Sequence, residues 1–80
     1  MKTTFRPRGT SSTLIAIEVE GGVLKKAAFT DGCSGNTQGV AALAAGRPVQ
    51  EVIKRLKGIR CGDKDTSCPD QLARALEGLA

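Results

Sequence analysis

The sequence predicts an α+β fold, in which a three-stranded antiparallel sheet is followed by three helices (β-β-β-α-α-α) packed on one face. Three features support this prediction. Ile15, Ile17 and Val19 recur at every second position, which is the period of a half-buried strand. Gly21 and Gly22 then allow a tight hairpin turn, because glycine tolerates positive φ angles. In the second half of the chain the apolar residues recur with the period of a helix.

Three strands are expected in the first part of the chain. A short strand spans residues 2–6 and is stopped by a turn cluster at residues 6–9, which contains a proline and a glycine. The second strand spans residues 13–20 and the third spans residues 23–30. Together they make an antiparallel sheet with one buried face.

The hairpin also predicts which residues face one another across the second and third strands. Glu18 should lie opposite Lys25, and such an oppositely charged pair contributes about 0.2–1 kcal/mol to stability. The same register places Ala28 on the inner face, where Lys26 interrupts the apolar surface. Phe29 is then expected on the outer face.

Two helices should follow the sheet. Asn36 is a favourable N-cap for a helix over residues 37–45, and Gly46 is a natural stop. Pro48 suits the first turn of a second helix that ends at Gly58. Their apolar stripes are Val40, Leu43 and Ala44 in the first helix and Val49, Val52, Ile53 and Leu56 in the second.

The third helix is expected to begin near Ser67. Ser67 and Asp70 have the spacing of a capping box, with aspartate in the place of the usual glutamate. Pro69 then falls at the first helical position, where its missing N–H costs nothing. The apolar residues of this helix are Leu72, Leu76 and Leu79.

The size of the chain limits its core. Its 80 residues are expected to form one domain, residues 1–80, and Phe5 and Phe29 are the only aromatic residues. The core must therefore consist of aliphatic side chains, which bury less area than aromatic rings. A core of this kind gains from a metal, a cross-link or a second subunit, so a homo-oligomer is one expectation.

The charge distribution argues against nucleic acid as a partner. The net charge of +4 comes from 12 Lys and Arg against 8 Asp and Glu. The dense basic cluster is Lys54, Arg55, Lys57 and Arg60. Nucleic-acid binding would require stacking aromatics among the basic residues, which this sequence lacks. We interpret the cluster as a solvated helix face, with binding of a small anion such as a nucleotide phosphate as the alternative.

The chain is expected to reside in the cytoplasm and away from membranes. No run approaches the roughly 18 apolar residues of a membrane span, and the N-terminal residues 1–5 lack an apolar signal region. Cytoplasmic thiols are reduced, so disulfides are not the default use of the three cysteines.

Cys33, Cys61 and Cys68 are the candidate ligands of a metal site. Each lies in a predicted loop beside glycine or acidic residues and away from the apolar stripes, whereas structural cysteines usually occupy core positions. Thiolates select zinc, iron–sulfur clusters or copper(I). We expect zinc or an iron–sulfur cluster, with Asp63 as the fourth ligand.

Other ligands and other uses of the thiols remain open. The alternatives for the fourth position are Asp31, Asp65, Asp70, water, a substrate sulfur or another chain. The alternatives to metal binding are simple free thiols and thiol redox chemistry, although no C-x-x-C pair is present. The chain has no histidine and no Ser-His-Asp set, so we expect no catalytic residue.

The loop around Cys33 also has the composition of an anion cradle. Gly32, Ser34, Gly35 and Asn36 lead directly into a predicted helix, whose first N–H groups could hold a phosphate. The alternative is a glycine-rich turn capped by Asn36.

The segment Thr66-Ser67-Cys68-Pro69-Asp70 spells the motif of the TSCPD domain family, which the chain resembles over essentially its whole length. The likeness extends through residues 32–36, 56–62 and 67–73. Longer relatives lie at or near the C-terminus of adenosylcobalamin-dependent ribonucleotide reductases. The resemblance implies a role in deoxyribonucleotide synthesis, with a ribonucleotide reductase or a nucleotide as partner. Because 80 residues cannot house a reductase barrel, we expect an accessory role without catalysis by this chain alone.

A more distant resemblance is to the NifU-type iron–sulfur scaffold proteins, which have three cysteines at comparable loops and a β-β-β-α-α-α order. It rests on residues 29–35, on Gly46 and Glu51, and on Cys68 followed by residues 72–73. It implies an iron–sulfur or persulfide scaffold as an alternative function. The aspartate that follows the first cysteine in that family is Gly35 here, and no histidine lies beside Cys68.

Overall fold

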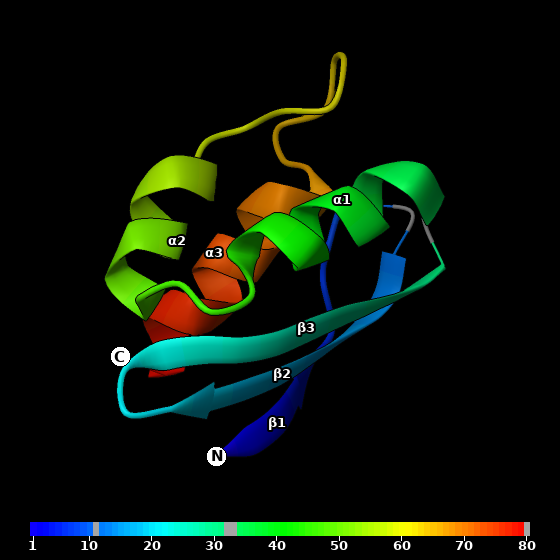
Figure 1. Ribbon diagram of the computed structural model, residues 1–80. Helices are drawn as coiled ribbons and strands as arrows, with labels where there is room; N and C mark the ends of the chain where they lie inside the picture. Colours follow the sequence, from blue (N-terminus) through cyan, green and yellow to red (C-terminus); the bar gives the residue numbers. More distant parts are fainter. Residues whose placement is uncertain (11, 32–33, 80) are drawn as a thin grey trace.

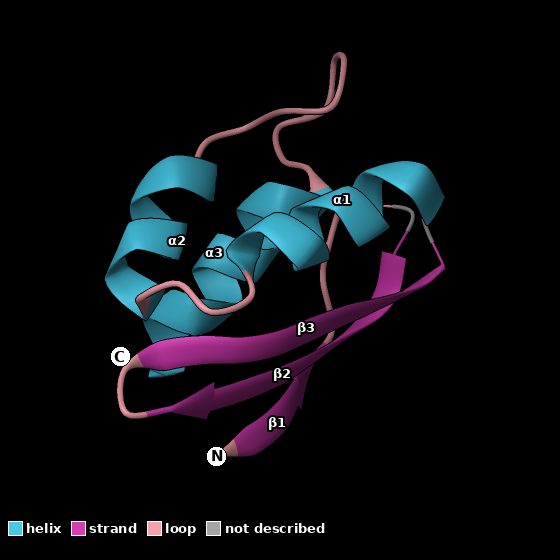
Figure 2. Ribbon diagram, viewed as in Figure 1, coloured by secondary structure: helices cyan, strands magenta, loops and turns pink. Residues whose placement is uncertain are grey.

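Three antiparallel strands form a sheet in the order β1-β2-β3, and three helices cover one of its faces (Figure 1). The computed structural model describes residues 1–10, 12–31 and 34–79. The elements are β1 (Lys2–Phe5), β2 (Ser12–Glu20), β3 (Val23–Asp31), α1 (Ser34–Ala44), α2 (Val49–Leu56) and α3 (Cys68–Leu79). The predicted fold class and element order are confirmed (Figure 2).

The β2–β3 hairpin contains a bulge that the sequence did not reveal. Glu20 pairs with Val23 across the two-residue turn, but Glu18 pairs with Lys26 and not with Lys25. The register shifts between Glu18 and Val19, so Lys25 is an extra residue in β3. The predicted pairing of Glu18 with Lys25 was therefore wrong.

The bulge reverses the two faces of the following part of β3. Ile17 pairs with Ala27 and Ile15 with Phe29, so Ala27 and Phe29 share the inner face, where Phe29 packs against the core. The predictions for this strand were therefore wrong: Lys26 and Ala28 lie on the outer face, and Phe29 lies on the inner one. The physical reason is the period of two, which a single inserted residue inverts.

The core lies between the sheet and the helices, and α1, α2 and α3 all contribute buried residues to it. Four of its side chains, Ile15, Leu24, Leu72 and Leu76, have no exposed surface. Two residues of the predicted apolar stripes lie outside this core. Leu43 on α1 is 72% exposed, and Leu79 near the end of α3 is 36% exposed.

The helix ends agree with the predicted stops, but the start of α1 does not. Gly46 and Gly58 adopt left-handed φ angles of 85° and 89°, and they follow α1 and α2 respectively. α1 begins at Ser34, so Asn36 lies within its first turn and is not the N-cap. β3 ends at Asp31, whose φ of 63° is left-handed, and the helix begins three residues later. It therefore starts earlier than predicted. No helix in the described ranges is long and apolar enough to cross a membrane.

Candidate functional site

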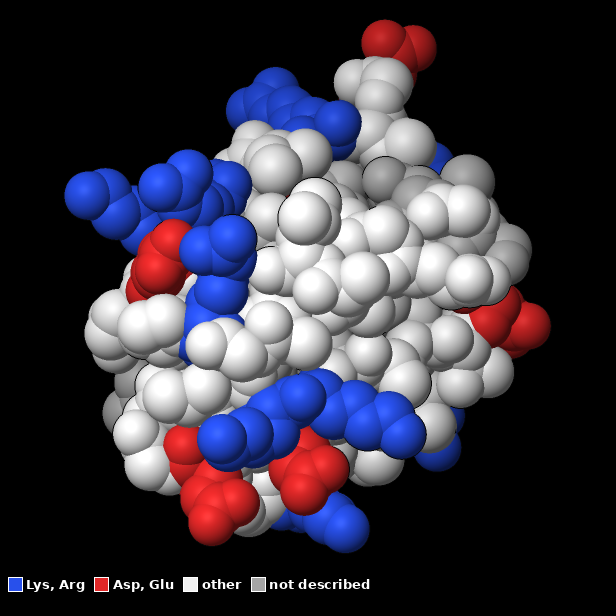
Figure 3. Space-filling view, in the orientation of Figure 1, with Lys and Arg blue, Asp and Glu red and all other residues white. Residues whose placement is uncertain are grey.

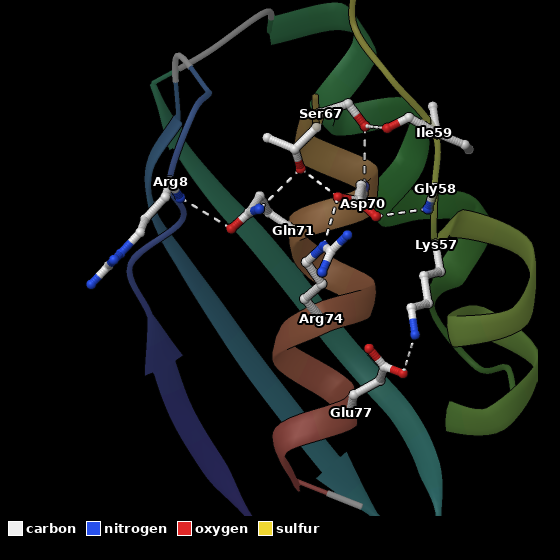
Figure 4. A network of polar contacts seen from close by, with 10 residues as sticks. Arg8, Lys57, Gly58, Ile59, Ser67, Asp70, Gln71, Arg74 and Glu77 are labelled. Atoms are coloured by element: carbon white, nitrogen blue, oxygen red, sulfur yellow. Dashed lines mark hydrogen bonds and ion pairs between the residues drawn. The ribbon is translucent and has the colours of Figure 1, made fainter. Parts of the chain in front are cut away.

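The motif Thr66–Asp70 begins α3 and carries a polar network (Figure 4). Ser67 Oγ accepts a hydrogen bond from the backbone N–H of Asp70 at 3.1 Å, which is the N-cap that the sequence predicted. The same hydroxyl donates to the carbonyl of Ile59 at 2.7 Å. Pro69 is the second residue of the helix. Ser67 therefore starts α3 and also holds the segment that follows α2.

Asp70 is fully buried, with no exposed surface. One carboxylate oxygen accepts the backbone N–H of Gly58 at 2.7 Å. The other accepts the hydroxyl of Thr66 and the Nε of Arg74, the latter at 2.8 Å. Asp70 thus does not return a hydrogen bond to Ser67 as a capping box would; it links the end of α2 to α3. Both of its oxygens are occupied within the protein.

The environment of Asp70 acts on its pKa in two opposing ways. Burial raises the pKa of the carboxyl, because it penalises the charged form. Hydrogen bonds from Thr66, Arg74 and Gly58 lower the pKa and outweigh the burial, so the pKa lies below its ordinary value. Asp70 is therefore an ionised structural group at neutral pH.

The lowered pKa of Asp70 predicts how stability responds to acid. The ionised carboxylate stabilises the fold above the unfolded-state pKa of 3.8, and this contribution is lost as pH falls through the lower folded-state pKa. Chemical unfolding at pH values from about 6 to about 2 should show the free-energy difference between the wild type and Asp70→Asn shrinking as pH falls. A difference that stays constant across this range would contradict the assignment.

The same network reaches the loop between β1 and β2. Gln71 accepts the backbone N–H of Arg8 at 3.0 Å through Oε1 and donates to the hydroxyl of Thr66 at 2.9 Å through Nε2. Gly9 has a φ of 75°, and a Cβ there would lie 2.9 Å from the methyl group of Thr66. The motif therefore joins the first loop of the chain to the last helix.

Sequence reasoning missed several members of this network, and their signals differ in strength. Arg74 lies four residues after Asp70, a spacing that predicts an ion pair on a helix, so it could have been found. Gln71 gave no such signal, because Arg8 is 63 positions away in the chain. Gly58 gave none, because it contributes only a backbone N–H.

Cys68 is the first residue of α3, and it is buried, with 8% of its surface exposed. Its Sγ lies 2.8 Å from the hydroxyl of Ser12, which is itself 3% exposed. The prediction that the cysteines avoid the core was therefore wrong for Cys68, because the start of β2 lies against the first turn of α3. No sequence pattern indicated Ser12.

Cys61 is exposed and lies in the loop between α2 and α3. Its backbone N–H donates to the carbonyl of Thr66 at 3.2 Å, and its carbonyl accepts the N–H of Lys64 at 3.0 Å. Asp63 is an exposed residue of the same tight turn. The loop therefore holds the backbone of Cys61 against that of Thr66, which lies two residues before Cys68.

The other predicted site residues are only partly described. Gly32 and Cys33 lie outside the described residues, as do the side chains of Ser34 and Asn36. Gly35 is exposed in the first turn of α1. The anion cradle of residues 32–36 remains a prediction.

Within the described ranges, no three His, Cys, Asp or Glu side chains lie close enough together to hold a metal ion. In this conformation, a metal site with three such ligands would consequently have to include Cys33.

The surroundings of Cys61 and Cys68 predict different thiol reactivities in metal-free protein. In a Cys33→Ser background, Cys61 should react with an aromatic disulfide reagent at the rate of an exposed thiol. Cys68 should react at least about tenfold more slowly, because the reagent must wait for local opening of the structure. Absorbance kinetics of the released thiolate give both rates. Equal rates would contradict the burial of Cys68.

Fold and site together define a small α+β domain in which a buried thiol at a helix start lies beside a satisfied polar network. The chain belongs to the TSCPD domain family, whose model matches residues 1–80. Comparisons with curated proteins and with solved structures found no match. The likeness to NifU-type scaffolds therefore remains a prediction.

Proposed function

We propose that this protein is a non-catalytic metal-binding module in which Cys33, Cys61 and Cys68 bind zinc or an iron–sulfur cluster, accessory to ribonucleotide reduction. The observation that carries the proposal is the position of Cys68 at the first turn of α3. A helix N-terminus stabilises the thiolate, which is the form that binds metal. The hydroxyl of Ser12 at 2.8 Å is placed to donate to that thiolate and orient it.

The paths of the three cysteine-bearing segments support a shared site. Ser12, which contacts Cys68, is paired with Asp31 in the sheet. Cys33 follows Asp31 by two residues, and two residues span at most about 7 Å. The backbone hydrogen bond from Cys61 to Thr66 draws the third segment toward the same helix start.

The ligand chemistry is compatible with the proposed metals. Three thiolates suit zinc or an iron–sulfur cluster, and an oxygen ligand or an external group can complete four-coordinate zinc. Asp63 is our candidate for that ligand, because it is exposed in the turn that contains Cys61. A bound metal would cross-link the α2–α3 loop to the β3–α1 connection, which would add stability to a small aliphatic core.

The role in ribonucleotide reduction rests on the family. The whole-chain match shows the TSCPD family. The longer relatives of that family that lie near the C-terminus of adenosylcobalamin-dependent ribonucleotide reductases support the proposed role. An accessory role in metal binding or thiol delivery fits a chain of 80 residues.

Nucleotide binding at the start of α1 is a second candidate. The first turn of that helix contains no acidic residue, which favours a phosphate there. Calorimetry with nucleoside di- and triphosphates tests it, and the absence of binding heat for both would remove it.

Elemental analysis of protein purified without chelator is the direct test of the metal proposal. About one zinc ion, or iron in cluster stoichiometry, is expected per chain. Chelation should then lower the melting temperature and make the cysteines more reactive. Metal-free protein of unchanged stability, with all its thiols reacting as before, would overturn the proposal.

A further inference from the structure

α1 is a surface helix that contains no charged residue, since its sequence is SGNTQGVAALA. The exposed positions among its described side chains are Gly35, Gln38, Gly39, Ala42 and Leu43. The outer faces of surface helices are ordinarily rich in charged residues. In Figure 3 the surface over α1 is uncharged, and Lys and Arg gather beside it over α2. Leu43, at 72% exposure, is the largest apolar side chain on this surface.

A groove between α1 and α2 continues this apolar surface. It has a volume of about 340 Å³, and Val40, Leu43 and Ala44 line it from the α1 side. Val52 and Leu56 line it from the α2 side. The groove therefore offers apolar side chains on both walls to a partner that brings apolar residues of its own.

The rim of the groove is positively charged. Arg47 and Arg55 complete its lining, and their side chains are 51% and 74% exposed. Both guanidiniums contact the single carboxylate of Glu51, at 3.2 and 3.3 Å. One carboxylate thus contacts two guanidiniums, which leaves a net positive rim around an apolar groove.

We propose that the groove between α1 and α2 is the docking site for an acidic amphipathic segment of a partner protein. Apolar side chains of that segment fill the groove and cover Leu43, while its carboxylates pair with Arg47 and Arg55. The glycine and alanine residues on the exposed face of α1 allow the partner backbone to approach closely. This docking is independent of the proposed metal site.

Charge complementarity favours this occupant over a second copy of the chain. A symmetric dimer through the groove would bring the rim residues of two identical surfaces together, and those rims carry the same sign of charge. An acidic segment meets the same rim with opposite charge and also covers the exposed leucine.

A synthetic amphipathic peptide, with leucines at helical spacing and glutamates at its other positions, tests the proposal. Titration into the isotopically labelled full chain should shift the backbone resonances of residues 40–47 and 52–56, and salt should weaken the binding. A peptide with lysine in place of each glutamate should leave them unshifted. Equal binding of both peptides, or shifts confined to other elements, would overturn the proposal.

Two variants locate the binding energy. Leu43→Ser and Arg55→Glu should each weaken binding of the acidic peptide by about tenfold or more. Both side chains are exposed, so the fold should be retained, and circular dichroism checks this. The matched controls are Ile59→Ser for an exposed apolar residue and Lys26→Glu for a cation on the far face of the sheet. Unchanged binding by Leu43→Ser, or a dimer in sedimentation that Leu43→Ser disrupts, would overturn the proposal.

Discussion

Replacing Asp70 by alanine is expected to lower the free energy of unfolding by about 3 kcal/mol. The substitution removes the acceptor for Gly58, Thr66 and Arg74 at a site with no exposed surface. The backbone N–H of Gly58 and the O–H of Thr66 then lose their acceptor within the protein. For a domain of this size, such a loss lowers the melting temperature by about 4–8 °C per kcal/mol.

Arg74→Ala is the matched control for this prediction. The Arg74 side chain is 51% exposed, so water screens its ion pair with Asp70 and replacing it should cost much less than replacing the buried carboxylate. Chemical and thermal unfolding of both variants measure the difference. If Asp70→Ala costs no more than Arg74→Ala, the linkage between α2 and α3 does not depend on this buried carboxylate.

Replacing Cys33 by serine is expected to abolish metal binding, from about one ion per chain to less than about a tenth. The reason is the donor count, because within the described ranges Cys61, Cys68 and the acidic residues form no group that could hold a metal ion. Elemental analysis and competition with a chromogenic chelator measure the occupancy. The same loss is expected for Cys61→Ser and Cys68→Ser.

Three further variants make the ligand test specific. Lys64→Ala changes an exposed residue of the Cys61 turn that is not a ligand, so it should leave the metal content unchanged. Asp63→Asn should weaken binding if its carboxylate is the fourth ligand. Ser12→Ala removes the hydroxyl beside Cys68 and should lower the affinity about 10–100-fold. Full metal content in Cys33→Ser protein would show that the three-thiol set is wrong.

Much of the backbone could be predicted because its signals are local. The alternation of Ile15 and Ile17 predicted β2, and the spacing of Val49 and Val52 predicted α2. Ser67 as an N-cap was also predictable, because the hydroxyl and the N–H that it accepts are three residues apart. Such interactions form within a short segment whatever surrounds it.

The faces of β3 could not be predicted, because they depend on one cross-strand irregularity. Lys25 has no property that marks it as a bulge residue, and the pairing of Glu18 with Lys26 is formed only in the sheet. One extra residue then moves Phe29 to the inner face. The hydrogen bonds between β2 and β3 decide which residues of β3 face the core, and they leave no local pattern in the sequence.

By itself, the sequence determined the order of the elements, the start of α3 at the TSCPD motif and the family of the chain. Only the tertiary structure decided that Cys68 is buried against Ser12, that Asp70 is fully buried, and that Leu43 is exposed. Burial depends on which distant element packs across a residue. Ser12 and Cys68 are 56 positions apart, so no local pattern of the sequence contains their contact.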